Sequence, residues 1–389
     1  MINLTKLLCN YSSYGDGLRY KPNTNSKARR PIVVWNATRR CNLSCIHCYS
    51  DSRNERYSGE LTTDEAQKMV RYLAAFKVPV LLFSGGEPLL RKDIFGLNEL
   101  ARKLKIRTVI STNGTLITRK AAFRIKEAGF DYVGVSLDGI GKRNDRFRGV
   151  DGTFSRALSA IRNLVEVRQK VGLRFTITRH NYIDIPGILK LAENENIDRI
   201  CFYHLVYAGR GNSMAKDDLT HSRMRACIDM LCDRVMSWDE MGIKKEVLTV
   251  DNHSDGPYLY LKVRKQDPRK AKIILKLLRY NGGNSSGIGI ANIDSQGLVH
   301  ADQFWQDYSF GSVRQKAFGD IWQDTSDELM RRLKNRKPYL KGRCGTCGFL
   351  DICNGNFRAR AKAYYRDAWQ EDPACYLRDE EIIPKISRS

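Results

Sequence analysis

Strand-like and helix-like segments alternate regularly between residues 31 and 205 of this 389-residue chain. Short runs rich in β-branched residues predict strands, and apolar residues at helical spacing predict helices between them. The predicted strands cover residues 32–35, 78–83, 108–111, 132–136, 174–178 and 199–205, and the predicted helices cover 62–76, 94–104, 119–128, 154–171 and 185–192. This alternation indicates βαβ units around a parallel sheet. We therefore expect the α/β class and a partial (β/α)6 TIM-like barrel, with functional residues at the carboxyl ends of its strands.

Three regions are expected along the chain. Residues 1–30 are polar and rich in turn formers, and they predict an N-terminal arm. Residues 31–250 contain the predicted barrel. Beyond residue 205 the pattern changes to a helix at 223–238, an irregular stretch, a helix at 269–280 and a Gly-rich break at 281–287. We expect residues 251–389 to form a linker and a small cysteine-rich domain, with a soft boundary between residues 250 and 285.

The chain is strongly basic, with 66 Lys and Arg against 43 Asp and Glu and a formal charge of +23. This balance favours an anionic partner, although a basic solvated surface would explain it equally well. The cations are spread along the chain without a polybasic tail, which suits an acidic substrate pocket at least as well as a nucleic-acid arm. No stretch approaches the roughly 18 apolar residues that span a bilayer, and residues 1–8 lack the long apolar core that a signal peptide would have. We expect a cytoplasmic monomer that binds neither membrane nor nucleic acid.

Seven of the eleven cysteines fall into two groups. Cys41, Cys45 and Cys48 form a C-x3-C-x2-C motif just after the first predicted strand. Three thiolates on one loop can hold three irons of a [4Fe–4S] cluster and leave the fourth iron open to an outside ligand. The alternative is a zinc site completed by His47, although structural zinc prefers four closed ligands.

The second group lies near the C-terminus and has the pattern C-x2-C-x5-C…C. It consists of Cys344, Cys347, Cys353 and Cys375. Four thiolates can complete a second [4Fe–4S] cluster, and they suit tetrahedral zinc equally well. The remaining cysteines are expected to be small buried apolar side chains; they are Cys9, Cys201, Cys227 and Cys232.

The second predicted strand ends in Ser84-Gly85-Gly86-Glu87-Pro88, one βα unit after the C-x3-C-x2-C motif. This order resembles the radical S-adenosylmethionine (SAM) superfamily. The resemblance implies that Gly85, Gly86 and Glu87 grip the methionyl amino group of SAM. It also implies SAM contacts from residues at the ends of the next two strands, namely Asn113, Ser136 and Asp138. Arg148 could pair with the methionyl carboxylate or be an ordinary surface arginine.

The C-terminal cysteine pattern resembles the SPASM/twitch extensions of the same superfamily. The full SPASM pattern has a further cysteine upstream, where residues 297–302 of this chain contain none. The resemblance therefore implies one auxiliary [4Fe–4S] cluster, and two clusters in total.

Segments at residues 18–20, 34–41, 202–211 and 250–256 resemble the tetrapyrrole-tailoring branch of that superfamily. Its members remove carboxylate side chains from an iron tetrapyrrole by means of a 5′-deoxyadenosyl radical. The resemblance implies loss of the acetate arms of 12,18-didecarboxysiroheme to give Fe-coproporphyrin III, with side-chain processing in the heme d1 route as the alternative. It also implies a polycarboxylate iron tetrapyrrole substrate and an electron donor such as ferredoxin or flavodoxin.

Two histidines are candidates for the chemistry. His204 follows a predicted strand and His253 lies in a polar loop, so either could ligate the substrate iron or donate a proton. Each could equally be a hydrogen-bonded structural residue. A peptide maturase and a non-enzymatic, RNA-binding protein are the other functional classes considered; the charge alone supports the latter, and it leaves both cysteine groups unexplained.

Overall fold

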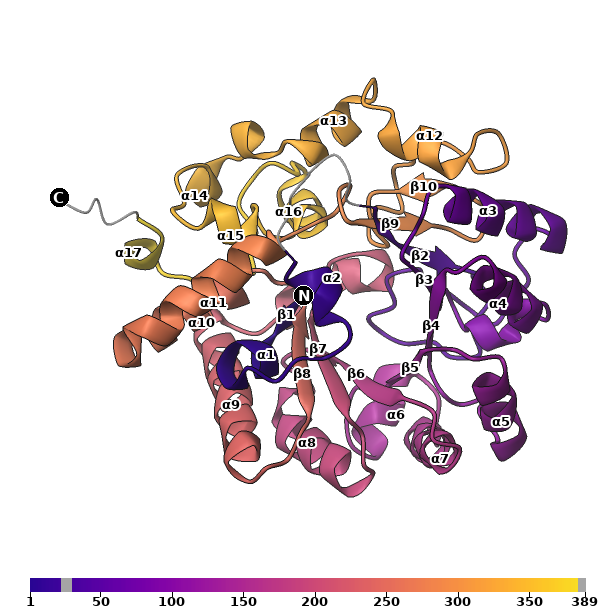
Figure 1. Ribbon diagram of the computed structural model, residues 1–389, viewed down its shortest axis with the longest axis horizontal. Coiled ribbons are helices and arrows are strands. Elements are labelled where there is room, and N and C mark those ends of the chain that lie inside the picture. The colour runs from indigo at the N-terminus through magenta and orange to yellow at the C-terminus, as the bar shows by residue number, and fades with distance from the viewer. Residues whose placement is uncertain (22–29, 384–389) are drawn as a thin grey trace.

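The computed structural model describes residues 1–21 and 30–383, and its strands form one ten-stranded sheet (Figure 1). The strand order is β1-β8-β7-β6-β5-β4-β3-β2-β9-β10. From β2 to β8 all neighbouring strands are parallel. These strands are β2 (Ile32–Asn36), β3 (Val80–Ser84), β4 (Arg107–Thr112), β5 (Tyr132–Ser136), β6 (Val171–Ile177), β7 (Arg199–His204) and β8 (Glu246–Val250).

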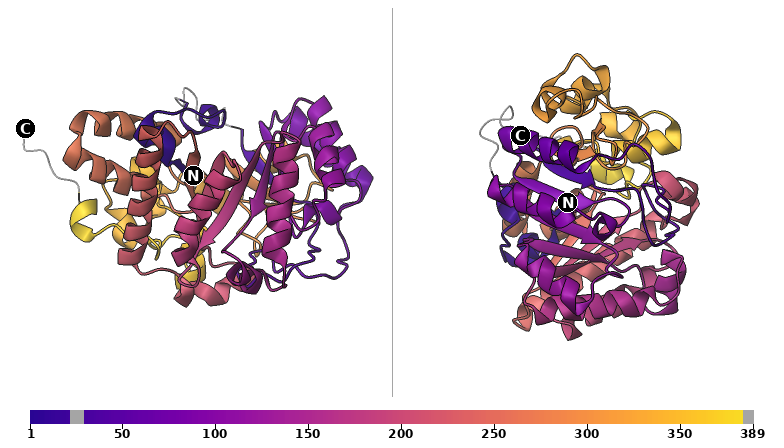
Figure 2. Two further views of the ribbon diagram at one scale, coloured as in Figure 1. Left: turned by 90° about the horizontal axis from the view of Figure 1, so that it is seen from below. Right: turned by 90° about the vertical axis from the view of Figure 1, so that its right-hand side faces the viewer.

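Helices follow the parallel strands and cover the outer face of the curved sheet (Figures 1 and 2). They are α3 (Thr63–Ala75), α4 (Ile94–Lys103), α5 (Arg119–Glu127), α6 (Lys142–Arg148), α7 (Thr153–Glu166), α8 (Ile185–Asn194) and α9 (His221–Glu240). The first of these begins with a capping box between Thr62 and Glu65, which satisfies backbone N–H groups at its N-terminus. Buried apolar side chains from both layers form one large core. The predicted α/β partial barrel is confirmed.

Two predicted boundaries were wrong for local reasons. Helix α7 ends at Glu166 rather than continuing to residue 171, because Arg168 adopts a positive φ of 54° and turns the chain. Strand β6 consequently begins at Val171, three residues before the prediction. The stretch predicted to be irregular contains β8, whose five residues are all buried. The short run at residues 247–250, between Glu246 and Asp251, gives too short a pattern to separate a strand from a loop.

The N-terminal residues close the barrel at the amino ends of its strands. Strand β1 (Ile2–Asn3) pairs antiparallel with β8, and the following helices are α1 (Leu4–Cys9) and α2 (Asp16–Arg19). The Asn3 amide donates to Asp16 and to Glu246 of β8, and Arg19 pairs with both carboxylates at 2.9 Å. Part of the predicted arm, residues 22–29, lies outside the described residues.

The C-terminal region continues the sheet rather than standing apart from it. Strand β9 (Ile290–Ile293) runs parallel to β2, and β10 (Val299–His300) pairs antiparallel with β9. In Figures 1 and 2 this region, coloured orange to yellow, gathers along the edge of the barrel beyond β2. Its helices are α10 (Asp255–Gln266), α11 (Pro268–Asn281), α12 (Phe318–Gln323), α13 (Glu328–Lys334), α14 (Gly342–Gly345), α15 (Leu350–Cys353), α16 (Arg358–Tyr365) and α17 (Asp379–Ile382). The division into three regions stays a prediction.

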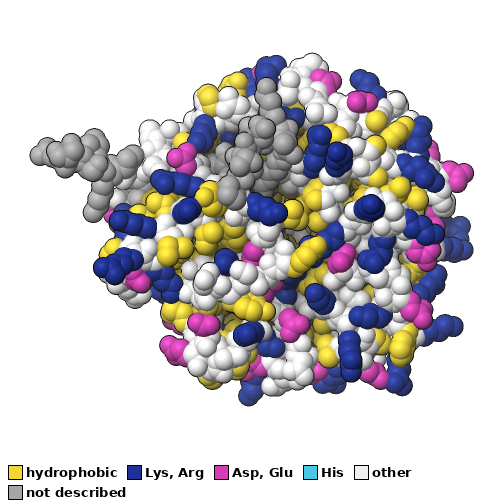
Figure 3. Space-filling model, in the orientation of Figure 1, with side chains coloured by type: hydrophobic (Ala, Val, Ile, Leu, Met, Phe, Trp, Pro, Cys, Tyr) yellow, Lys and Arg dark blue, Asp and Glu magenta, His cyan; other side chains and the backbone are white. Residues whose placement is uncertain are grey.

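The basic side chains are scattered over the surface. In the face shown in Figure 3, Lys and Arg are distributed among acidic and apolar side chains without forming one stripe. Across the part of the chain that is described, no helix combines the length and apolar character needed to cross a membrane.

Candidate active site

A cavity of about 420 Å³ lies inside the barrel. Because side chains alternate along a strand, every second residue of β4 to β7 faces this interior. The loop that follows β2 and carries Cys41, Cys45 and Cys48 forms one wall of the cavity. Residues 283–286 and 302–304 of the C-terminal region form another wall. The carboxyl ends of the strands and the C-terminal region therefore enclose one common space.

The three cysteines of the loop at residues 41–48, here the cysteine loop, lie together. All three line the cavity and belong to one apolar cluster with Leu43. Burial raises the pKa of the Cys41 thiol to about 12, so bound iron would be needed to hold it as a thiolate at neutral pH. A group of buried thiols beside an open cavity fits a cluster that three thiolates hold and that keeps one iron accessible.

The loop after β7 holds the cysteine loop in place. The Arg210 side chain donates through Nε to the carbonyl oxygen of Cys45 at 2.8 Å and pairs with Asp51 at 2.7 Å. Gly209 has a φ of 55°, and a Cβ at this position would lie 2.4 Å from the carbonyl oxygen of Cys48. This close approach requires glycine, which accounts for the Gly-Arg-Gly sequence after the strand.

Gly85 and Gly86 line the cavity at the end of β3 and pack against the start of the cysteine loop. A Cβ on Gly85 would lie 2.3 Å from the Thr38 carbonyl oxygen, and one on Gly86 would lie 2.2 Å from that of Arg40. The Gly86 amide donates to the Thr38 carbonyl at 2.7 Å. The two glycines thus let two backbone segments meet, in addition to any approach by a ligand.

The Glu87 side chain is fully buried and is not one of the residues that line the cavity. Its carboxylate accepts hydrogen bonds from the Thr112 hydroxyl at 2.8 Å, from the Asn113 amide at 2.8 Å and from the Leu89 amide at 3.1 Å. Burial raises its pKa to about 7. The predicted contact with a methionyl ammonium stays a prediction. In this geometry the carboxylate positions the turn that carries Asn113.

Asp138 is also fully buried, and its main partner is Arg148. The Asp138 carboxylate further accepts from the Thr176 amide at 2.6 Å and lies 3.5 Å from Nε2 of His47. Arg148 lines the cavity and places Nη1 3.6 Å from the sulfur of Cys45. Arg148 is therefore not a plain surface arginine, and Asp138 acts on the cavity through it.

Asn113 and Ser136 face the cavity as the sequence predicts for SAM contacts. The side-chain amide of Asn113 donates to the side-chain oxygen of Asn42 in the cysteine loop at 2.9 Å. The same amide nitrogen lies 3.9 Å from the sulfur of Cys41. Together with Gly85, Gly86 and Arg148, these residues gather at one end of the cavity beside the cysteine loop. Whether they bind SAM stays a prediction.

The four C-terminal cysteines surround a second, small pocket, here the auxiliary pocket. It is lined by Cys344, Cys347, Cys353 and Cys375. Arg358 lies beside it, with Nη2 4.0 Å from the Cys344 sulfur. Within residues 1–21 and 30–383, no three Cys, His, Asp or Glu side chains converge closely enough to bind one metal ion. The four thiols share one pocket.

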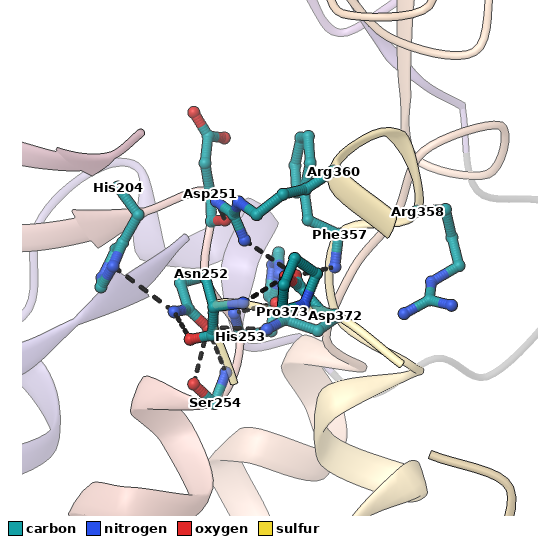
Figure 4. Close-up of polar contacts among 12 residues, drawn as sticks. His204, Asp251, Asn252, His253, Ser254, Phe357, Arg358, Arg360, Asp372 and Pro373 are labelled. Atoms are coloured by element: carbon teal, nitrogen blue, oxygen red, sulfur yellow. Dashed lines mark hydrogen bonds and ion pairs between the residues drawn. The ribbon is translucent and has the colours of Figure 1, made fainter. Parts of the chain in front are cut away.

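His204 uses both ring nitrogens within the protein. Its Nε2 lies 3.0 Å from the Asp255 carboxylate. Its Nδ1 lies 3.4 Å from the side-chain amide nitrogen of Asn252, a contact drawn in Figure 4. The Asp255 carboxylate in turn accepts from the Tyr376 hydroxyl at 2.5 Å. To ligate an iron, His204 would have to give up one of these contacts. Its catalytic role stays a prediction.

His253 lies in the loop after β8 and lines the cavity. Its Nε2 contacts the N-terminal amine of Met1 at 3.0 Å, whereas its buried Nδ1 has no hydrogen-bond partner among the described residues. Burial holds its pKa well below the usual range, so the ring is neutral. Figure 4 shows this loop facing Arg360 and Asp372 of the C-terminal region. His253 stays the candidate with an unused nitrogen.

Sequence reasoning missed several residues of the barrel interior. Tyr132, Arg174 and Tyr203 all line the cavity. A signal was present: an arginine at position 174 interrupts an otherwise apolar strand, Val-Gly-Leu-Arg-Phe-Thr-Ile. An inward-facing charge in a barrel strand indicates a functional interior.

The profile of the radical SAM superfamily matches residues 35–192. The chain is 52% identical to Fe-coproporphyrin III synthase of Methanosarcina barkeri, over 98% of this chain and 99% of that protein. It is 45% identical to pre-heme d1 synthase of Dinoroseobacter shibae, over 94% and 91%. Among solved structures, SuiB of Streptococcus suis bound to the precursor peptide SuiA has a TM-score of 0.72 at 19% identity, covering 90% of this chain and 76% of that chain. That last similarity shows the fold alone.

Proposed function

Because the chain belongs to the radical SAM superfamily and is an enzyme of its heme-biosynthesis group, we propose that it removes the acetate side chains of 12,18-didecarboxysiroheme and forms Fe-coproporphyrin III. The observation that carries this proposal is the 52% identity with Fe-coproporphyrin III synthase, which extends over 98% of this chain. The cavity supports it, because the cysteine loop and an inward-facing arginine open into the same space.

A [4Fe–4S] cluster with bound SAM would supply the radical chemistry of this superfamily, the abstraction of a hydrogen atom from the substrate. In this chain Cys41, Cys45 and Cys48 would hold three of the irons. The side chains of Asn113 and Ser136 face the same end of the cavity and would contact SAM. The barrel wall around the cavity would limit the access of water to the reacting groups.

Pairing between Arg148 and Asp138 keeps the guanidinium beside the cysteine loop. From that position Arg148 would bind the methionyl carboxylate of SAM through a charge-assisted hydrogen bond. Glu87 would act indirectly, by holding the Asn113 backbone through its buried carboxylate.

We also propose that the auxiliary pocket holds a second [4Fe–4S] cluster. Four cysteines line this pocket, and four thiolates can each hold one iron of a cubane. Four thiolates also suit tetrahedral zinc, so the metal content of the protein decides between the two.

Three further parts of the proposal concern the setting of the enzyme. A ferredoxin or flavodoxin would supply the electron that the cluster needs. The chain would act as a monomer in the cytoplasm. All eleven cysteines are unpaired, and unpaired thiols suit a reducing compartment.

The test of the reaction is anaerobic incubation of the reduced, iron-loaded enzyme with SAM and didecarboxysiroheme, followed by mass spectrometry. Products that lack one and then both acetates are expected, together with 5′-deoxyadenosine. Processing of the propionate arms would instead indicate the heme d1 reaction, the second candidate, which the 45% identity with pre-heme d1 synthase favours. Formation of 5′-deoxyadenosine without any change in tetrapyrrole mass would refute both and leave a peptide maturase as the better interpretation.

The test of the second cluster is iron analysis under anaerobic conditions. Two cubanes give about eight irons per chain, whereas about four irons with added zinc would exclude the auxiliary cluster. Cys353→Ala should lose the auxiliary iron and keep cleavage of SAM, and Cys45→Ala should abolish that cleavage. Cys227→Ala is the matched control, because this buried cysteine of helix α9 lines neither the cavity nor the auxiliary pocket.

A further inference from the structure

Arg174 projects from the middle of β6 into the cavity. Its register neighbours are Ser136 on β5 and Cys201 on β7, which places it inside the barrel below the carboxyl ends of the strands. Within the described residues its guanidinium makes neither an ion pair nor a hydrogen bond. Its central carbon lies over the Tyr203 ring, 4.5 Å from the ring centroid. A charged group in such an enclosed site is costly unless something pairs with it.

The other arginines that line the cavity all have carboxylate partners. Arg148 pairs with Asp138, and Arg107 lies 3.9 Å from Asp131. The same holds at the closed end of the barrel, where Arg19 and Arg199 both pair with Glu246. Among the cavity-lining arginines of residues 1–21 and 30–383, Arg174 therefore differs in having no carboxylate within ion-pair distance.

Two strand glycines make room for this arrangement. A Cβ on Gly134 would lie 2.8 Å from Cδ of Arg174, and a Cβ on Gly172 would lie 2.3 Å from the Tyr132 hydroxyl. Glycine inside a strand weakens it and usually marks a close approach. Both glycines therefore weaken their strands, and both leave space for a side chain that lines the same cavity.

A phenol that lines the same cavity also lacks a hydrogen-bond partner. The Tyr132 hydroxyl is buried without a hydrogen bond to any described residue, although a buried hydroxyl is normally satisfied. Burial raises the pKa of Tyr132 and of Tyr203, so both phenols stay protonated at neutral pH and can donate. The Arg174 guanidinium and the Tyr132 hydroxyl are thus two donors without an acceptor, and a carboxylate is the acceptor that best suits a guanidinium.

We propose that Arg174 binds one carboxylate of the substrate inside the barrel. The assignment rests on the proposed tetrapyrrole function, whose substrate carries several carboxylate arms. It specifies which arginine recognises the substrate, and it places the anchored arm in the cavity that the cysteine loop borders. Arg174 thereby limits the cavity to ligands with an acidic side chain that can reach the middle of β6.

The first experiment measures binding of Fe-coproporphyrin III to the iron-loaded enzyme by the shift of its Soret band. Arg174→Met should raise the dissociation constant about tenfold or more, because one charge-assisted contact is lost, and Arg174→Lys should recover part of the loss. The dissociation constant of SAM should not change. Arg162→Met is the matched control, since this arginine is exposed and pairs with Glu195 on the outer surface.

The second experiment distinguishes recognition from a structural role by thermal unfolding without tetrapyrrole. Arg174→Met removes a charge that has no anion, so its unfolding temperature should equal or exceed that of the wild type. A lower unfolding temperature would mean that Arg174 stabilises the barrel and would overturn the assignment. Equal tetrapyrrole binding by wild type and Arg174→Met would overturn it as well. Failure of the wild type to bind Fe-coproporphyrin III would overturn the proposed function first, and this assignment with it.

Discussion

The ion pair between Asp138 and Arg148 offers the sharpest test of how the cavity is built. Asp138→Asn keeps the shape of the side chain and removes its charge. The amide oxygen can still accept from the Thr176 backbone, a contact of 2.6 Å in the wild type. The change therefore isolates the loss of charge opposite Arg148, whose side chain is only 10% exposed against 0% for Asp138.

The expected loss of stability is large because the surviving charge stays buried. Removing one partner of a buried ion pair costs about 3–5 kcal/mol, mostly from the uncompensated charge. Glu195→Gln breaks a comparable pair with Arg162, but that arginine is 60% exposed. An exposed pair contributes about 0–1 kcal/mol, so this control should have little effect. The double variant Asp138→Asn/Arg148→Met leaves no buried charge and should recover most of the loss.

Urea unfolding of the iron-loaded protein under anaerobic conditions, followed by circular dichroism, measures these differences. Asp138→Asn should shift the midpoint strongly, and it should weaken SAM binding because Arg148 is no longer oriented. If Asp138→Asn and Glu195→Gln have equal effects below about 1 kcal/mol, the buried pair does not hold Arg148 and the reasoning fails.

Gly86→Ala should lower the iron content of the cysteine loop, because the new Cβ would lie 2.2 Å from the Arg40 carbonyl oxygen; Gly96→Ala has nothing within 4 Å and should leave iron content unchanged. Equal iron in both variants would contradict the packing argument. Burial raises the Glu87 pKa from 4.5 to about 7, so its contribution to stability is fully present below pH 4.5 and is lost as the pH rises through 7. The free energy of unfolding should therefore fall by up to about 3 kcal/mol over this range, and Glu87→Gln should remove that fall in a pH series. A pH dependence identical to that of the wild type would assign the buried charge elsewhere.

The barrel and the cysteine positions could be predicted from the sequence because their signals are local. Strand and helix periodicity is contained in each short segment, and ligand spacing can be counted directly. Membership of the radical SAM superfamily, predicted from the order of the motifs, is confirmed by the full-length relatives. Strand β8 was missed because it is defined by its pairing with β7, a long-range contact that a pattern of five residues cannot predict.

The roles of Glu87 and Asp138 could not be read from the sequence for a different reason. A position at the end of a strand indicates the neighbourhood of a side chain but not its direction. Both carboxylates turn into the protein, where Asn113 and Arg148 are their partners. Arg174 could have been found from the sequence, because the alternation of side chains along a strand places it on the inner face. Its lack of a partner is visible only in three dimensions.

The charge of +23 and the single guanidinium of Arg174 act at different ranges. The surface cations attract a polycarboxylate through water, and salt screens that attraction over about 10 Å at 0.1 M. The Arg174 contact would form inside an enclosed cavity, where salt screens a pair much less. Added salt should therefore act mainly on the rate of association, whereas loss of Arg174 should act mainly on the rate of dissociation. The net charge attracts all carboxylates of a substrate alike. The unpaired arginine inside the barrel would instead select the one carboxylate that reaches it.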